Sequence, residues 1–133
     1  MISFVDASFL IALLYKKDSF HLRARQISQS LLDPRLFTSN VVIAEVVNYI
    51  YRTGGPEAAK TTLTLIKKTG IEEVYATKEI FDSAYNFLFR QKYKKGLNLF
   101  DCLHLATMKT LGIKTILTFD QGFKKEVKVI GLQ

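Results

Sequence analysis

The sequence predicts an α/β fold: a three-layer α/β/α sandwich in which helices cover both faces of a central, mainly parallel sheet of about five strands. Short apolar runs alternate along the chain with longer segments whose apolar residues recur at helical spacing. Such alternation is typical of parallel sheets buried on both faces. The length of 133 residues suits one domain, spanning residues 1–133, around a single core.

Strands and helices are expected to alternate in the following order. The short apolar runs predict strands at residues 2–5, 36–38, 73–76, 114–119 and 127–130. The helical spacing of apolar residues predicts helices at residues 7–17, 21–32, 40–52, 56–70, 78–93 and 98–111.

Local signals support several of these boundaries. Asn40 and Asn98 are placed to cap the helices that follow them. Gly54-Gly55 and Gly112 are placed to end helices, and Pro56 suits the first turn of the next one. In such sheets, ligands bind beyond the carboxyl ends of the strands, so the residues that follow the strands are the first candidates for function.

Charge and cysteine content narrow the class of protein. The formal net charge is +7 and the isoelectric point is near 9.5. A small domain this basic often binds a polyanion, although lysines that only maintain solubility would give the same balance. The single Cys102 cannot form an internal disulfide, which fits the cytoplasm. No apolar run approaches the ~20 residues that span a bilayer, and we expect neither a signal peptide nor a membrane partner.

Eight of the 12 acidic residues lie among charges, at turns or near helix starts. The other four lie in apolar surroundings. They are Asp6, Glu45, Asp101 and Asp120. Asp6 and Asp120 could cap the segments that follow them, and Asp101 stands in the first turn of its helix. Glu45, in "NVVIAEVVNYI", is hardest to explain this way, because a carboxylate among Val, Ile and Ala costs free energy unless it is paired.

All four carboxylates can converge on one crevice in the predicted architecture. Clustered carboxylates repel one another, but become tolerable when they hold a hard divalent cation. A ligand set without His or Cys suits Mg²⁺ or Mn²⁺ better than zinc. We therefore interpret Glu45 as a metal ligand, or as a holder of metal-bound water. A basic rim around this crevice would hold a nucleic-acid backbone.

Nearly the whole chain resembles the PIN-domain nucleases, and among them the VapC-type toxins of toxin–antitoxin pairs. The resemblance rests on "FVDASFLIAL", "TSNVVIAEVVN" and "LNLFDCLHLATMKTLGIKTILTFDQGF", which place Asp6, Glu45, Asp101 and Asp120 at the four acidic positions of the family. It implies a Mg²⁺- or Mn²⁺-dependent endoribonuclease that acts on RNA, forms a homodimer and often has an antitoxin partner. Ser8 and Thr118 match polar positions that support the metal site. Many relatives carry a further acidic residue where this chain has Gly122.

Two other functions stay open. A catalytically weak PIN-like module could bind RNA or a protein without cutting, although binding alone gains nothing from repelling carboxylates. A phosphatase-like or receiver-type domain could also hold an acidic pocket, but the basic balance and the motif order disfavour it.

Other chemically active residues have simpler interpretations. His21 and His104 could be general bases, but we expect His104 to be a packed helix residue. Cys102 is expected to act as a small buried hydrophobe. Aromatic side chains between residues 81 and 93 could stack bases, although their helical spacing favours core or dimer packing.

Overall fold

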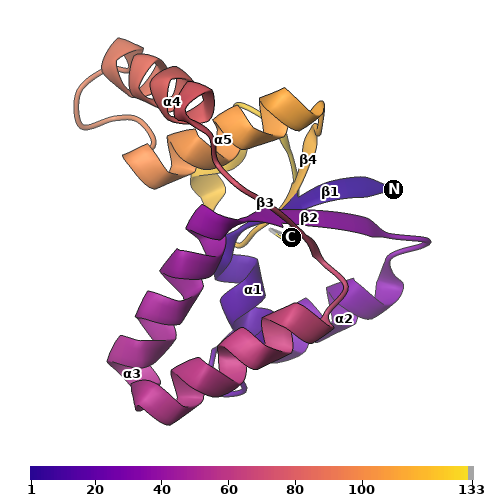
Figure 1. Ribbon diagram of the computed structural model, residues 1–133. Coiled ribbons are helices and arrows are strands. Elements are labelled where there is room, and N and C mark those ends of the chain that lie inside the picture. Colours follow the sequence, from indigo (N-terminus) through magenta and orange to yellow (C-terminus); the bar gives the residue numbers. More distant parts are fainter. Residues whose placement is uncertain (132–133) are drawn as a thin grey trace.

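The computed structural model describes residues 1–131 and confirms the predicted α/β class (Figure 1). Five strands form one sheet in the order β3-β2-β1-β4-β5, and every neighbouring pair is parallel. Their bounds are β1 Ile2–Val5, β2 Arg35–Ser39, β3 Glu72–Val74, β4 Thr115–Leu117 and β5 Lys128–Ile130.

Helices cover both faces of the sheet. In Figure 1, α4 and α5 lie on one side of the strands, and α1, α2 and α3 lie on the other. The helices are α1 Ala7–Leu14, α2 His21–Ser30, α3 Asn40–Lys68, α4 Lys78–Arg90 and α5 Leu99–Leu111, with a short 3₁₀ helix, η1, at Gln121–Phe123. The sequence did not predict η1.

The long helix α3 contains the break that the glycines predict. Gly55 has φ 89° and ψ 179°, a conformation outside the helical region that glycine adopts because it has no side chain. Pro56 then starts the second half of α3. The two helices predicted at 40–52 and 56–70 therefore meet at a kink rather than at a loop.

Several predicted helices and strands extend a few residues beyond the observed ends. The helix predicted to residue 93 ends at Arg90, because the side chain of Gln91 closes the following loop. Its Nε2 donates to the carbonyl of Leu97 at 2.9 Å, and its Oε1 accepts from the Leu97 N–H at 2.7 Å. The first helix stops at Leu14, and the strand predicted at 114–119 stops at Leu117.

Two apolar clusters hold the layers together. The larger one fills the space around the sheet, where Phe4, Leu10 and Ile116 are fully buried. The smaller one joins α4 to α5 through residues that include Ala84 and Cys102, so Cys102 is buried as predicted. Within residues 1–131, no helix has the length and apolar character needed to cross a membrane.

Candidate active site

The sheet register brings residues from distant parts of the chain to one edge. Val5 pairs with Leu117, so Asp6 and Thr118 leave the central strands side by side. The Asp6 N–H donates to the Leu117 carbonyl at 3.0 Å, which fixes this arrangement. The helix that follows β2 carries Glu45. These positions lie at the carboxyl edge, where ligands bind in open parallel sheets.

Asp6 is held by two hydroxyl groups. Thr118 Oγ1 donates to Asp6 Oδ2 at 2.7 Å, and Ser8 Oγ lies 3.1 Å from the same oxygen. Ser8 and Thr118 also contact each other at 3.0 Å. Asp6 precedes α1 but makes no side-chain capping bond to it, so capping does not explain this residue. Asp6 is only 5% exposed, and burial of a carboxylate requires such partners.

Glu45 is paired with a histidine. His104 Nε2 lies 2.6 Å from Glu45 Oε1, and the Glu45 side chain is 31% exposed while His104 is fully buried. The same nitrogen lies 3.7 Å from Asp6 Oδ1. Because a carboxylate oxygen accepts, we place the imidazole proton on Nε2. Nδ1 is buried without a partner among the described residues.

Asp101 caps the start of its own helix and also lies near two other carboxylates. It forms a capping box with Asn98, in which Asn98 Oδ1 accepts from the Asp101 N–H at 2.9 Å and Asp101 Oδ2 accepts from the Asn98 N–H at 3.3 Å. Burial and the nearby charge of Asp120 raise the pKa of Asp101 to about 6, with a smaller contribution from Asp6. The capping role is therefore present, but the carboxyl also lies in the field of two other carboxylates.

Asp120 turns the chain into η1. Its Oδ1 accepts from the Gly122 N–H at 2.8 Å, and its own N–H donates to Thr118 Oγ1 at 2.9 Å. A Cβ atom on Gly122 would lie 2.9 Å from Leu97 Cδ2 and 3.2 Å from Asp120 Oδ1. A side chain at position 122 would need only the end of the flexible Leu97 side chain to move, so packing does not by itself require glycine here.

The four predicted carboxylates lie at the same edge of the sheet but do not form a closed ligand cage. In residues 1–131, no three His, Cys, Asp or Glu side chains are arranged to hold a metal ion. Asp6, Glu45, Asp101 and Asp120 each accept a hydrogen bond from a protein group instead. The chemistry of the set still fits Mg²⁺ or Mn²⁺, because its ligands are oxygens and Mg²⁺ keeps several waters when only one or two carboxylates bind it.

The structure shows more than packing at His104. The sequence interpretation was correct that this residue is packed in its helix, but its contact with Glu45 was missed. The available signal was its position three residues after Asp101 on one helix, which places both on neighbouring parts of the surface of α5. The other histidine, His21, bonds the carbonyl of Ala12 through Nδ1 at 2.7 Å and belongs to the contact between α1 and α2.

Solved structures with similar folds include a toxin and a toxin–antitoxin complex. The VapC20 toxin of Mycobacterium tuberculosis, described as cleaving the sarcin–ricin loop, is 28% identical with a TM-score of 0.83, and 94% of each chain is covered. A chain of VapBC2 from Rickettsia felis, bound to a promoter DNA fragment, is 14% identical with a TM-score of 0.71, over 98% of each chain. A chain of VapBC-1 from Haemophilus influenzae is 17% identical with a TM-score of 0.69, over 98% of this chain and 97% of that one.

Comparison with curated protein sequences finds no match. The family model described as the PIN domain, however, matches residues 3–128. This match includes all four carboxylates and all of the sheet except Ile2 of β1 and the last two residues of β5. The chain therefore belongs to the PIN-domain family.

Proposed function

We propose that this protein is a Mg²⁺- or Mn²⁺-dependent endoribonuclease that hydrolyses RNA phosphodiester bonds. The observation that carries the proposal is the placement of Asp6, Glu45, Asp101 and Asp120 at one edge of the sheet in a PIN domain. The similarity to VapC20, whose description names cleavage of the sarcin–ricin loop, supports RNA as the substrate. The net charge of +7 supports a polyanionic substrate.

Some residues of the site would bind the cation, and others would orient the carboxylates that bind it. Asp6, Glu45, Asp101 and Asp120 would hold the cation, directly or through water. The chemistry that a bound Mg²⁺ or Mn²⁺ supplies is a lower pKa for the attacking water and neutralisation of charge in the transition state. Ser8 and Thr118 fix Oδ2 of Asp6, which leaves Oδ1 free of hydroxyl contacts. His104 positions Glu45 through its Nε2.

We further propose that the protein is the toxin of a toxin–antitoxin pair and acts in the cytoplasm. The similar chains from Rickettsia felis and Haemophilus influenzae come from VapBC structures, which supports a cognate antitoxin as partner. A homodimer is the expected assembly. Copurification of the chain with the product of an adjacent gene would test the antitoxin, and failure of every adjacent product to bind would contradict it.

An RNA cleavage assay tests the proposed activity. The purified chain should cut structured RNA in millimolar Mg²⁺ or Mn²⁺ and not in chelator. Loss of one carboxylate should reduce the rate on the order of 10- to 100-fold or more, the scale seen when metal sites lose supporting groups. The variants are Asp6→Asn, Glu45→Gln, Asp101→Asn and Asp120→Asn. Glu57→Gln is the control, because Glu57 is exposed and pairs only with exposed Lys60.

One observation favours a second candidate, a PIN-like module that binds RNA or a protein without cutting. The carboxylates of the described chain form no ready three-ligand group, and His104 occupies an oxygen of Glu45. RNA binding that survives in chelator, combined with no cleavage in either metal, would select this candidate over the nuclease.

A further inference from the structure

A groove separate from the four carboxylates lies between α4, α5 and the segment 124–128. It has a volume of about 830 Å³. Its floor contains the buried side chains of Cys102, Met108 and Ile113. Six basic side chains line it, and we call the whole feature the basic groove: Arg90, Lys109, Lys114, Lys124, Lys125 and Lys128.

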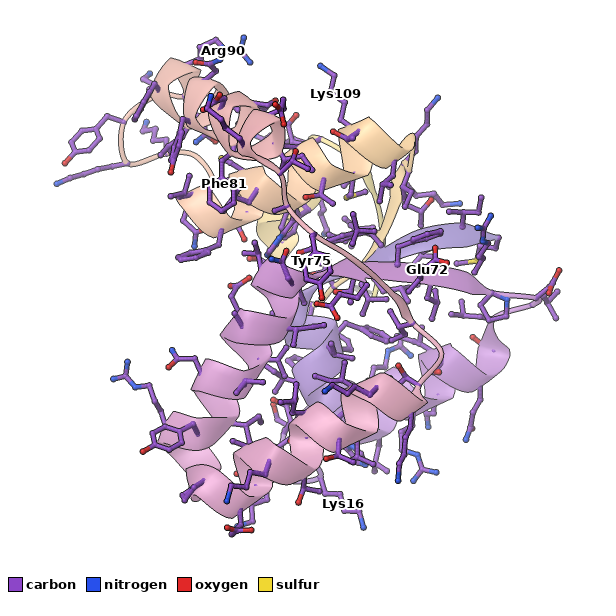
Figure 2. All side chains as sticks on the ribbon, in the orientation of Figure 1. Lys16, Glu72, Tyr75, Phe81, Arg90 and Lys109 are labelled. Atoms are coloured by element: carbon purple, nitrogen blue, oxygen red, sulfur yellow. The ribbon has the colours of Figure 1, made fainter. Side chains whose placement is uncertain are left out.

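The charge of the basic groove is almost entirely positive and unpaired. All six basic residues are exposed, and none forms an ion pair anywhere in the described chain. Among residues 1–131, Glu126 is the one acidic residue that lines the groove. Figure 2 shows Arg90 and Lys109 projecting from α4 and α5 away from the layer of α1, α2 and α3. Unpaired cations around an apolar floor attract a ligand that carries negative charges and a flat or apolar part.

The basic groove runs along α5, from Cys102 near the start of this helix to Gly112 and Lys114, which precede β4 at the edge of the sheet opposite to the carboxylates. Cys102 in its floor follows Asp101 directly, and consecutive Cα atoms are ~3.8 Å apart. On another wall, Lys124 follows η1, whose preceding residue is Asp120. One end of the basic groove is therefore close along the chain to Asp101 and Asp120, and the rest of the groove leads away from the carboxylates.

We infer that the basic groove binds the RNA strand that flanks the cleaved phosphodiester, with phosphates on the lysines and a base near Phe87. This inference rests on the proposed function. Phe87 lines the groove beside Arg90, and unpaired RNA bases stack on aromatic rings and guanidinium planes. A second copy of this chain is a poor occupant, because a two-fold contact would bring two sets of the same cations together.

RNA binding by a charge-reversal variant tests the inference. The variant is Lys124→Glu with Lys125→Glu, and its matched control is Lys67→Glu with Lys68→Glu, an exposed pair on α3. Binding of labelled RNA is measured by fluorescence anisotropy over a range of salt, in chelator and in the Asp6→Asn background, so that cleavage does not interfere. The groove variant should weaken binding roughly tenfold or more at ~0.1 M salt, and its salt slope should fall by about 0.7 for each phosphate that the variant no longer neutralises. The control should change binding less than about twofold.

Steady-state kinetics on the cleaving protein give a second measurement. The groove variant should raise KM for a long RNA more than it lowers kcat, because the groove binds RNA away from the cleaved bond. Lys109→Gln with Lys114→Gln repeats the test from another wall, so that misfolding of one variant does not decide it. A thermal melt checks each fold.

Three outcomes would overturn the inference, and they separate it from the proposed function. If the wild type cuts RNA while the groove variants and the control bind it equally well, only the groove assignment is wrong. If the wild type neither binds nor cuts RNA, both proposals are wrong. If poly-glutamate binds the wild type more tightly than RNA does and the groove variant loses this binding, the occupant is an acidic protein segment.

Discussion

Asp101 is both a capping residue and one of a group of carboxylates, and these roles have opposite consequences for stability. Its pKa of about 6 is raised mainly by burial and then by Asp120, so the folded chain takes up this proton more readily than the unfolded chain. The contribution of Asp101 to the free energy of unfolding is therefore most favourable below pH ~4, and it is lost as the pH rises through about 6.

We predict that Asp101→Asn stabilises the metal-free protein at pH 7.5 and that this gain shrinks as the pH falls toward 4. Asparagine removes the charge but keeps an oxygen that can accept from the Asn98 N–H. Urea unfolding in chelator, over that pH range, measures the effect. Asp101→Ala is the comparison, because it removes the acceptor as well. A variant Asp101→Asn that is less stable than wild type at pH 7.5 would show that capping outweighs repulsion.

His104 acts on the site through its bond to Glu45. We predict that His104→Leu weakens Mn²⁺ binding and lowers kcat on the order of 10-fold or more, the usual effect of losing an outer partner of a metal ligand. His104→Gln should restore most of both, because its amide nitrogen can reach Glu45 and donate. Calorimetric titration of Mn²⁺ and a thermal melt accompany the kinetics. Equal losses in the Leu and Gln variants would mean that His104 only packs the core.

Helix α4 presents aromatic side chains on the side opposite the basic groove. The Phe81 and Tyr85 rings lie 6.2 Å apart, the Tyr85 and Phe89 rings lie 6.4 Å apart, and Phe89 is 77% exposed. In Figure 2, Phe81 and Arg90 lie on opposite sides of this helix. Ile80 and Ala84 are buried in the contact with α5, and Phe81 packs partly buried against the same cluster. The exposed rings of the aromatic row, Tyr85 and Phe89, are the part of α4 left for a neighbour.

We predict a homodimer that buries this aromatic row. Phe89→Glu should shift the chain from dimer to monomer, since burying an unpaired charge in an interface is costly. Sedimentation velocity at micromolar concentration measures the shift. Leu22→Glu on α2 is the control, because Leu22 is similarly exposed on the opposite layer. A wild-type protein that sediments as a monomer without a partner would contradict the prediction.

Charge is distributed unevenly over the molecule. Four carboxylates lie at the carboxyl ends of the strands, and lysine and arginine are in excess elsewhere. We predict that Mn²⁺ stabilises the wild type by about 2.7 kcal/mol at a hundredfold excess over its dissociation constant. Asp6→Asn should gain much less, because it loses a ligand charge. Thermal melts in chelator and in Mn²⁺ measure the difference. Equal shifts of the melting temperature in both proteins would show that the ion binds elsewhere. The absence of a shift in either protein would show that the carboxylates do not form a metal site.

The order of elements and the shared location of the four carboxylates were predictable from the sequence, because both depend on signals within a few residues; their role as metal ligands stays a prediction. Helical spacing, alternation of strands and helices, and the glycines and asparagines at helix ends predicted the layers and the strand direction. The break at Gly55 and the cap at Asn98 appear where these signals placed them. The predicted cap at Asn40 is wrong, because Ser39 caps α3 and the side chain of Asn40 accepts from the Ala76 N–H. The apolar setting of Glu45 also indicated that this carboxylate needed a partner.

Only the tertiary structure identified that partner and the groove. The bond from His104 to Glu45 spans 59 positions and that from Thr118 to Asp6 spans 112, and both depend on how the helices pack and how parallel strands align. The end of α4 at Arg90 depends on Gln91 bonding the backbone of Leu97 across the following loop. Local periodicity carries no information about such pairs, because their energies arise only when separate elements come into contact.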